Sequence, residues 1–406
     1  MAGIRLAGTR RRRPRRRGTA GCAADDRRRS RPHPAGRDHR PHRQGQGHLL
    51  HGARVRLAPG LAGRTGRDQR HQRTEESPVS VAPGLQPESW HLLSLLDRAP
   101  GLHTLADTLA DLADEGHPIV VGTADLKYSN GLIRFQERHP DRYVQFGISE
   151  QHMVSTAAGL ATTGLQPYVA TFASFLALLA CEQIRTDVAY TNLPVRLIGH
   201  HAGITLGFYG TSHHATEDLA IMRSIAGLTV IAPADATQLG AALRAAATYP
   251  GPIYFRIGRG QDPDVYTGPA PEFVIGRAVE HGAGTDLTII ATGSMVHPSL
   301  VAASRLRADG LSVGVLDMHT VKPLDTEAVL AAAARSSAIL TVEEHNVLGG
   351  LGGAVAEVVA QEGLPTRVWR HGILDEYALI GPPTHLYRHY GLDSDGVEGA
   401  ARKALA

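Results

Sequence analysis

Cysteine is scarce in this chain of 406 residues, which contains only Cys22 and Cys181. Two cysteines cannot form a framework of several disulfides or a four-cysteine zinc site, and such scarcity is typical of the reducing cytoplasm. The hydrophobic content of 42% is ordinary, but no apolar run approaches the ~20 residues that cross a bilayer as a helix. We therefore expect a cytoplasmic protein with no membrane partner.

Lysine is absent from the first 78 residues, which contain 21 arginines and six acidic residues. This segment carries a charge of +15, so the rest of the chain carries −12 within a total of +3. An arginine-rich arm could bind nucleic acid, but GC-rich DNA read out of frame also encodes arginine, glycine, proline, alanine and histidine without lysine. We expect residues 1–78 to reflect a start assigned too far upstream, with translation beginning near Val79 and no nucleic-acid partner. The alternative is a disordered basic arm.

From residue 90 onward, apolar residues follow the periods of helices and strands. Continuous apolar stretches such as PIVVGTADL (residues 118–126) predict buried strands, and they alternate with stretches of helical period. This alternation predicts an α/β fold with two largely parallel sheets. The first domain is predicted over residues 90–262 and a smaller one over residues 273–406, with a linker rich in proline and glycine between them.

Two segments carry local predictions. The stretch FLALLACEQIRTDVAY, residues 175–190, is predicted to be one helix. In the second domain, the glycines of HNVLGGLGGAVAE, residues 345–357, stand between a strand and a helix. Such glycines suit phosphate binding at a helix N-terminus. Because the full dinucleotide fingerprint is absent, a plain tight turn is the other interpretation.

Titratable residues gather in two places. Glu150 of QFGISEQHM stands where a strand-like segment meets a helix-like one, so it either stabilises the helix start through the helix dipole or has a chemical task. The pairs His200–His201 and His213–His214 lie near acidic residues and offer ligand types that zinc accepts. Neighbouring side chains of a strand point to opposite faces, so each pair is predicted to offer one usable ring, and we expect no metal site.

Six segments resemble the C-terminal portion of transketolases in their order and spacing: TADL…SN, GISEQHM, TFASF, LIGHHAG, GTSHHATEDL and FRIGRG. The resemblance covers about residues 95–406 and implies a pyrimidine-binding domain followed by a transketolase C-terminal domain. It extends more distantly to deoxyxylulose-phosphate synthase and to the β subunits of 2-oxoacid dehydrogenases. Transketolases use thiamine diphosphate and Mg²⁺ to transfer a two-carbon ketol unit from a ketose to an aldose, as in pentose phosphate metabolism.

The resemblance implies a cofactor site. Glu150 matches the carboxylate that binds the pyrimidine N1′ of thiamine diphosphate and promotes formation of its C2 ylid. Phe172 and Phe175 match aromatic residues beside the pyrimidine ring, where offset stacking is favourable; considered alone, they would be read as core residues. Asp125 matches an aspartate that supports the cofactor cleft.

The resemblance also implies a substrate channel. His201 and His213 match histidines that bind donor hydroxyls or move protons. Arg259 matches an arginine for the terminal phosphate of the substrate, a group that a guanidinium binds bidentately. Arg256 is the alternative, because strand alternation does not exclude it. Ser129 matches a serine that contacts phosphate.

Three positions depart from the family pattern. Tyr209 stands where transketolases have an aspartate that reads the stereochemistry of the donor hydroxyls, and it is predicted to contact the substrate. His103 falls about where a second phosphate-binding arginine is expected, and Leu178 replaces an aromatic residue. These departures are consistent with a specialised sugar or a branched acceptor.

The GDG motif, through which thiamine enzymes hold the diphosphate and its metal, does not occur in the sequence. The chain is therefore interpreted as the C-terminal subunit of a split transketolase, active in an α2β2 heterotetramer whose other subunit holds most of the Mg²⁺ contacts. Read one base out of frame, residues 42–60 can encode TVKGKGISFMEHAFAWHRG, which resembles the end of the missing domain. We thus expect the partner to be encoded immediately upstream. A non-catalytic binding module, in which Glu150 would be replaceable, is the remaining alternative.

Overall fold

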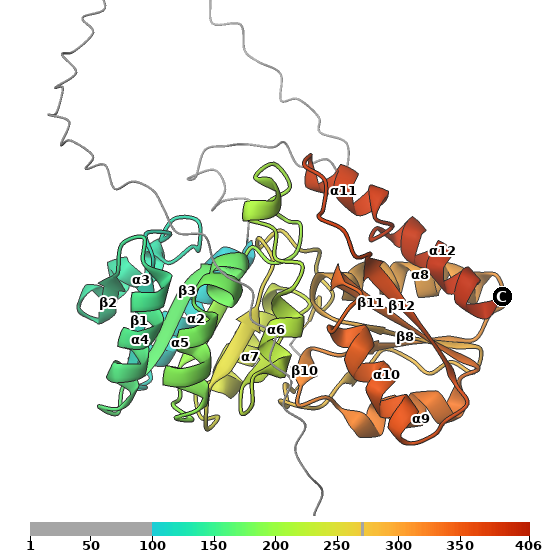
Figure 1. Ribbon diagram of the computed structural model, residues 1–406, viewed down its shortest axis with the longest axis horizontal. Helices are drawn as coiled ribbons and strands as arrows, with labels where there is room; N and C mark the ends of the chain where they lie inside the picture. Colours follow the sequence, from blue (N-terminus) through green and yellow to red (C-terminus); the bar gives the residue numbers. More distant parts are fainter. Residues whose placement is uncertain (1–99, 269–271) are drawn as a thin grey trace, which may run out of the picture. The chain divides into compact units, whose positions relative to one another are not determined.

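The computed structural model describes residues 100–268 and 272–406, which contain two sheets with flanking helices (Figure 1). The predictions for residues 1–78, for a start near Val79 and for residues 90–99 lie outside the described residues.

The first sheet has seven strands among the described residues, in the order β10-β5-β6-β4-β3-β1-β2. Every pairing is parallel except that of β10 with β5. The carboxyl ends of β3, β4 and β6 therefore meet along one edge. The strands are β1 (Ile119–Thr123), β2 (Tyr143–Gln145), β3 (Gln166–Phe172), β4 (Arg196–His200), β5 (Thr229–Ile231), β6 (Ile253–Arg256) and β10 (Thr320–Lys322).

Alternate residues of these strands pack on opposite faces of the first sheet. In β3, Tyr168 packs in a core with α2, α3 and α7, whereas its neighbour Val169 packs with α4 and α6 on the other face. Both faces are thus covered, which explains why the strands are apolar throughout. The helices are α2 (Pro100–Asp114), α3 (Ile133–Arg138), α4 (Glu150–Ala161), α6 (Asp218–Ser224) and α7 (Ala236–Ala246).

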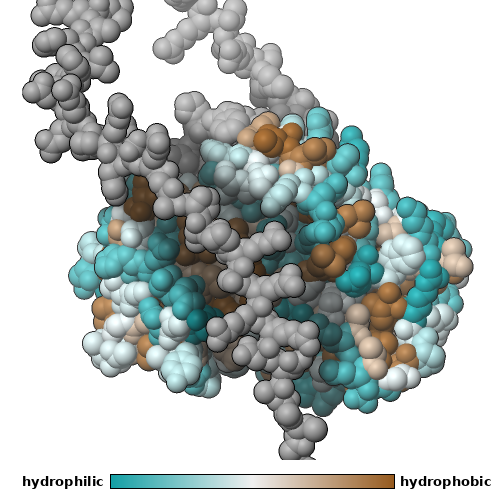
Figure 2. All heavy atoms as spheres, in the orientation of Figure 1, coloured by the Kyte–Doolittle hydropathy of each residue, from teal (hydrophilic) through white to brown (hydrophobic). Residues whose placement is uncertain are grey.

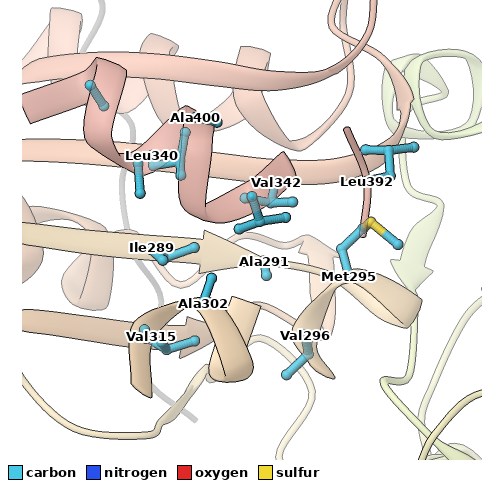
Figure 3. Close-up of a cluster of buried hydrophobic side chains, with 14 of the residues drawn as sticks. Ile289, Ala291, Met295, Val296, Ala302, Val315, Leu340, Val342, Leu392 and Ala400 are labelled. Atoms are coloured by element: carbon cyan, nitrogen blue, oxygen red, sulfur yellow. The ribbon is translucent and has the colours of Figure 1, made fainter. Parts of the chain in front are cut away.

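The second sheet has five strands among the described residues, in the order β12-β11-β8-β9-β7. Figure 3 shows Ile289 of β8 and Leu340 of β11 packed among residues of the helices, including Ala302 of α8 and Ala400 of α12. The elements are β7 (Val279–Glu280), β8 (Leu287–Ala291), β9 (Val313–Asp317), β11 (Ala338–Asn346), β12 (Arg367–Ile373), α8 (Val296–Ala308), α9 (Thr326–Arg335), α10 (Leu351–Gln361), α11 (Pro383–His389) and α12 (Ser394–Leu405). The prediction of two largely parallel α/β sheets is confirmed.

The prediction of one regular helix over residues 175–190 is wrong. The segment consists of η2 (Phe175–Leu179) and η3 (Ile184–Ala189), both π-helical, on either side of the short α5 (Cys181–Gln183). The N–H of Ala180 donates to the carbonyl of Phe175 at 3.3 Å, which is the i→i+5 bond of a π-turn. Such widened turns occur frequently at functional sites.

The glycine-rich turn before α10 is filled by Glu343. Its carboxylate accepts hydrogen bonds from the N–H groups of Leu351 at 2.7 Å and Gly352 at 2.8 Å. A Cβ atom on Gly350 would lie 2.0 Å from the same carboxylate, so glycine is needed for this close approach. An internal carboxylate thus takes the place that a phosphate would need, which favours the tight-turn interpretation.

Asp317, at the end of β9, gives a testable pH dependence. Its Oδ2 accepts from Gln238 and from the Tyr266 hydroxyl, both at 2.6 Å. Burial raises the pKa of Asp317 to about 7, whereas an aspartate in an unfolded chain has a pKa of about 3.9. Between these values the folded state binds a proton that the unfolded state releases, so this group destabilises the fold as the pH rises from about 4 to about 7.

We expect Asp317→Asn to remove this dependence, because an amide oxygen can accept both hydrogen bonds without carrying a charge. The thermal midpoint of the variant should exceed that of the wild type by ~3 °C or more at pH 8, with the difference closing towards pH 4. The exposed Asp264→Asn change is the control for loss of one charge. A difference that stays constant with pH would contradict the prediction.

Candidate active site

Glu150 is the first residue of α4, at the carboxyl end of the neighbouring strand β3. Its carboxyl group is 7% exposed, and its Oε1 accepts a hydrogen bond of 3.1 Å from the hydroxyl of Thr171. This bond fixes the orientation of the carboxylate and leaves Oε2 as the oxygen available to a ligand. Thr171 was quoted in the sequence motif TFASF without a role; its place one residue before the end of β3 explains the one found here.

Five rings form a continuous group beside this position. Phe172 lies 5.6 Å from Phe175, 4.8 Å from His201 and 5.7 Å from His213, measured between ring centroids. Phe175 and Tyr209 each contact His213 as well, at 5.1 and 4.8 Å. We call these five residues the aromatic–histidine group. β3, η2 and the loops after β4 contribute to it, so the structure brings together residues from three of the six sequence motifs.

The two rings of the His200–His201 pair lie side by side, 4.6 Å apart between centroids. The prediction that they point to opposite faces is wrong, because His201 lies beyond the end of β4 and has a φ of 55°. This left-handed conformation is uncommon for a residue with a side chain, and it breaks the strand alternation that the prediction assumed.

Burial keeps both histidines of the aromatic–histidine group uncharged. Burial lowers the pKa of His201 well below its ordinary value, with further contributions from His200, Arg259 and His213. Burial also lowers the pKa of His213. A neutral imidazole has one donor and one acceptor nitrogen, so near pH 7 these rings can bind hydroxyl groups or accept a proton.

The two arginines of FRIGRG have different surroundings. Arg256 is buried, and its Nε donates to Asp218 at 2.9 Å while its Nη2 donates to the carbonyl of Glu344 at 2.8 Å. It therefore serves the interior, where the Asp218 carboxylate compensates its charge. Arg259 lies in the loop after β6, close enough to His201 for its charge to lower the pKa of that ring.

Asp125 and Ser129 lie in the loop after β1. The N–H of Asp125, a residue with a φ of 61°, donates to the side chain of Gln145 at 2.7 Å. Ser129 precedes Asn130, whose amide bonds to Thr123 at 3.2 Å. Within the described ranges, no hydrogen bond or ring contact joins Asp125 or Ser129 to the aromatic–histidine group. The structure thus places them at the same sheet edge without connecting them to it.

Residues 100–268 and 272–406 contain no group of three or more histidine, cysteine, aspartate or glutamate side chains that could hold a metal ion. No helix in these ranges has the length and apolar character required to cross a membrane.

Comparisons with known proteins agree with this arrangement. Residues 102–263 match the family model of the transketolase pyrimidine binding domain, and residues 276–397 match that of the transketolase C-terminal domain. One of the two subunits of an apulose-4-phosphate transketolase from Phocaeicola vulgatus is 38% identical over 294 residues, which cover 72% of this chain and 94% of that protein. The chain belongs to the transketolase family.

Two further relatives of this transketolase-family chain are separate subunits or products of split genes. A 6-deoxy-6-sulfo-D-fructose transketolase subunit of Clostridium sp. is 37% identical over 305 residues, covering 74% of this chain and 94% of that protein. The solved structure of a split gene transketolase, described as an inactive β4 tetramer, has a TM-score of 0.69 and 39% identity, covering 76% of this chain and 98% of that one. The chain thus corresponds to the C-terminal subunit of a split transketolase.

The positions that depart from the family pattern have defined surroundings. The exposed Tyr209 stacks near His213, and Leu178 of η2 is exposed. The ring of His103 lies 2.8 Å from a guanidinium nitrogen of Arg134, which comes from α3. An arginine therefore reaches the place where the family pattern led us to expect one, although from another part of the sequence. No motif pointed to it.

Proposed function

We propose that this chain is the pyrimidine-domain subunit of a split, thiamine diphosphate-dependent transketolase that transfers a two-carbon ketol unit from a ketose to an aldose. The observation that carries the proposal is Glu150, a buried carboxylate held at Oε1 by Thr171 next to the stacked Phe172 and Phe175. A carboxylate beside aromatic rings fits a flat, protonatable pyrimidine. The absence of a metal cluster from the described residues and of GDG from the sequence is consistent with a partner that holds Mg²⁺ and the diphosphate.

When bound, thiamine diphosphate supplies a nucleophilic carbon that accepts the two-carbon unit. In the proposed mechanism, Oε2 of Glu150 binds the pyrimidine nitrogen and shares its proton. Phe172 and Phe175 hold the ring and exclude water. His201 and His213, both neutral, bind sugar hydroxyls or take up their protons, since their pKa values are lowered by burial.

Tyr209 is the residue that we expect to alter sugar selection. A neutral phenol next to His213 offers a hydroxyl, whereas the aspartate of the family pattern offers a charged acceptor. The two relatives named above carry apulose 4-phosphate and 6-deoxy-6-sulfo-D-fructose in their names, so specialised sugars occur among relatives of this chain. We propose a specialised ketose donor or a branched acceptor for this subunit.

The test is reconstitution with the subunit encoded upstream. The mixture should be offered a panel of phosphorylated and free ketoses with aldose acceptors, and the products identified by mass spectrometry. Two-carbon transfer that requires thiamine diphosphate and Mg²⁺ supports the proposal. Decarboxylation of a 2-oxoacid in its place, or no turnover of any ketose, contradicts it.

Arg259→Ala should raise the KM for phosphorylated substrates and spare unphosphorylated ones. Charge-assisted hydrogen bonds are worth ~1.5–3 kcal/mol, which predicts a rise of roughly 10- to 150-fold. Arg305→Ala, on α8 in the second sheet domain, is the control for loss of one arginine. If Arg259→Ala impairs both substrate types equally, the arginine has a structural role or the substrate carries no phosphate.

A further inference from the structure

His200 defines the protonation of its own ring through a backbone contact. Its Nδ1 lies 2.9 Å from the backbone nitrogen of His201, whose N–H also points towards the carbonyl of Gly258 at the longer distance of 3.4 Å. A backbone N–H can only donate a hydrogen bond. The Nδ1 of His200 must therefore be an acceptor, which places the single proton of this neutral ring on Nε2.

The surroundings of the other nitrogen of His200 agree with this assignment. Its Nε2 is buried and has no hydrogen-bond partner within the described part of the chain. The ring borders a small cavity that is also lined by Asp235 and Asp262. A protonated nitrogen suits a cavity with acidic side chains, which can only accept when ionised. Burial lowers the pKa of His200 to about 3, so the ring is neutral near pH 7.

The proton of His201 follows from that of His200. The two Nδ1 atoms lie 2.8 Å apart, so one of them must donate to the other. Because His200 accepts at Nδ1, His201 donates and carries its proton on Nδ1. A neutral imidazole has only one such proton. The Nε2 of His201 is consequently left with a lone pair.

This lone pair belongs to the candidate active site. The ring of His201 packs against Phe172 at 4.8 Å, and Phe172 in turn contacts His213. The left-handed backbone of His201, with a φ of 55°, holds the ring in this place. Since Nδ1 is engaged by His200, Nε2 is the ring atom that remains for a ligand.

We propose that His200 is a positioning residue that fixes His201 as the Nδ1–H tautomer, so that His201 receives a hydroxyl of the sugar and not its phosphate. Phosphate monoesters are mostly dianionic near neutral pH and offer acceptors only. An acceptor nitrogen repels them but can bind an O–H donor. The tautomer stands on the geometry alone, whereas the assignment to a sugar hydroxyl rests on the proposed function.

Neutron diffraction from crystals of the deuterium-exchanged full chain tests the tautomer directly. We expect deuterium on Nδ1 of His201 and on Nε2 of His200, and none on Nε2 of His201. Deuterium on Nε2 of His201 would overturn the proposal. This measurement requires neither cofactor nor partner, so it decides the tautomer even if the chain proves to have no transketolase activity.

Two substitutions separate the acceptor from the bulk of the His200 side chain. His200→Asn retains an oxygen that can accept near the position of Nδ1, whereas His200→Leu fills the site without an acceptor. In the reconstituted enzyme, His200→Leu should lower kcat/KM for the natural ketose about 2- to 10-fold, the value of one hydrogen bond, and His200→Asn should restore most of it. Equal losses in both variants would overturn the positioning role.

The sugar itself provides the last comparison. A deoxy analogue that lacks the hydroxyl bound by His201 should be a poorer substrate than the parent ketose for the wild type, but nearly equivalent to it for His200→Leu. Removal of the phosphate should instead affect both enzymes alike. If the phosphate-free ketose, and not the deoxy analogue, abolishes the difference between the two enzymes, His201 serves the phosphate and the proposal is wrong.

Discussion

Glu150→Gln should lower turnover by the reconstituted enzyme ~10²- to 10⁴-fold, the usual contribution of a general acid–base group. The substitution preserves the shape of the side chain, and the amide oxygen can still accept the 3.1 Å bond from Thr171. What it removes is the ability of the other oxygen to share a proton with the pyrimidine of the cofactor. Folding and assembly should therefore be unchanged while the chemistry is lost.

Exchange of the C2 proton of bound thiamine diphosphate in D₂O measures this step before any sugar takes part. We expect slow exchange in the Glu150→Gln complex and fast exchange in the control Glu182→Gln, which alters an exposed carboxylate paired with Arg185. Thr171→Val, which removes only the bond that orients Glu150, should have an intermediate effect of about 2- to 10-fold. Unchanged exchange in Glu150→Gln would show that the carboxylate is structural and would favour a non-catalytic module.

The main features of the fold follow from local sequence patterns. Strands buried on both faces are apolar throughout, so the two parallel sheets could be predicted from the sequence alone. β10 could not, because three residues beyond β9 pair antiparallel with β5 of the first sheet, and no local pattern specifies a partner so distant in sequence. The π-turns around Ala180 were missed because apolar spacing does not distinguish an i→i+4 from an i→i+5 turn.

The candidate site shows the same division. Motif order identified Glu150 and the phenylalanines, but it could not decide between Arg256 and Arg259, since the pairing of Arg256 with Asp218 is a tertiary contact. The positive φ of His201 was equally invisible, and strand alternation gave the wrong orientation for its ring. Chemistry-bearing residues could thus be found from the sequence, whereas their partners depended on contacts between distant segments.

Apolar side chains are exposed next to the candidate site, and they bear on the partner. Tyr377 is 76% exposed and Ile380 is 69% exposed in the segment before α11, which is joined to the site loop by a 3.0 Å bond from the N–H of Gly381 to the carbonyl of Gly207. Ile148, two residues before Glu150, is 85% exposed. Figure 2 shows apolar atoms gathered at the upper edge of this face, beside the position of α11 in Figure 1. Exposed apolar clusters of this kind mark interaction surfaces.

We expect this chain alone to self-associate and to bind thiamine diphosphate weakly, and its mixture with the upstream-encoded subunit to form an α2β2 heterotetramer that binds the cofactor tightly with Mg²⁺. The reason is that Glu150 and the phenylalanines address only the pyrimidine, while the described residues offer no metal cluster for the diphosphate. The related split gene transketolase structure, described as an inactive β4 tetramer, is a self-associated form of a similar chain.

Calorimetric titration of thiamine diphosphate into each subunit and into the mixture, with and without Mg²⁺, distinguishes the outcomes, and light scattering gives the masses. Binding that appears only in the mixture supports a cofactor site divided between two chains. Ile380→Glu, which places a charge in the exposed apolar segment, should weaken assembly and cofactor binding together, whereas the exposed Asp264→Asn change should affect neither. Tight, metal-dependent binding by this chain alone would refute the divided site, because all the ligands of the diphosphate would then have to come from one subunit.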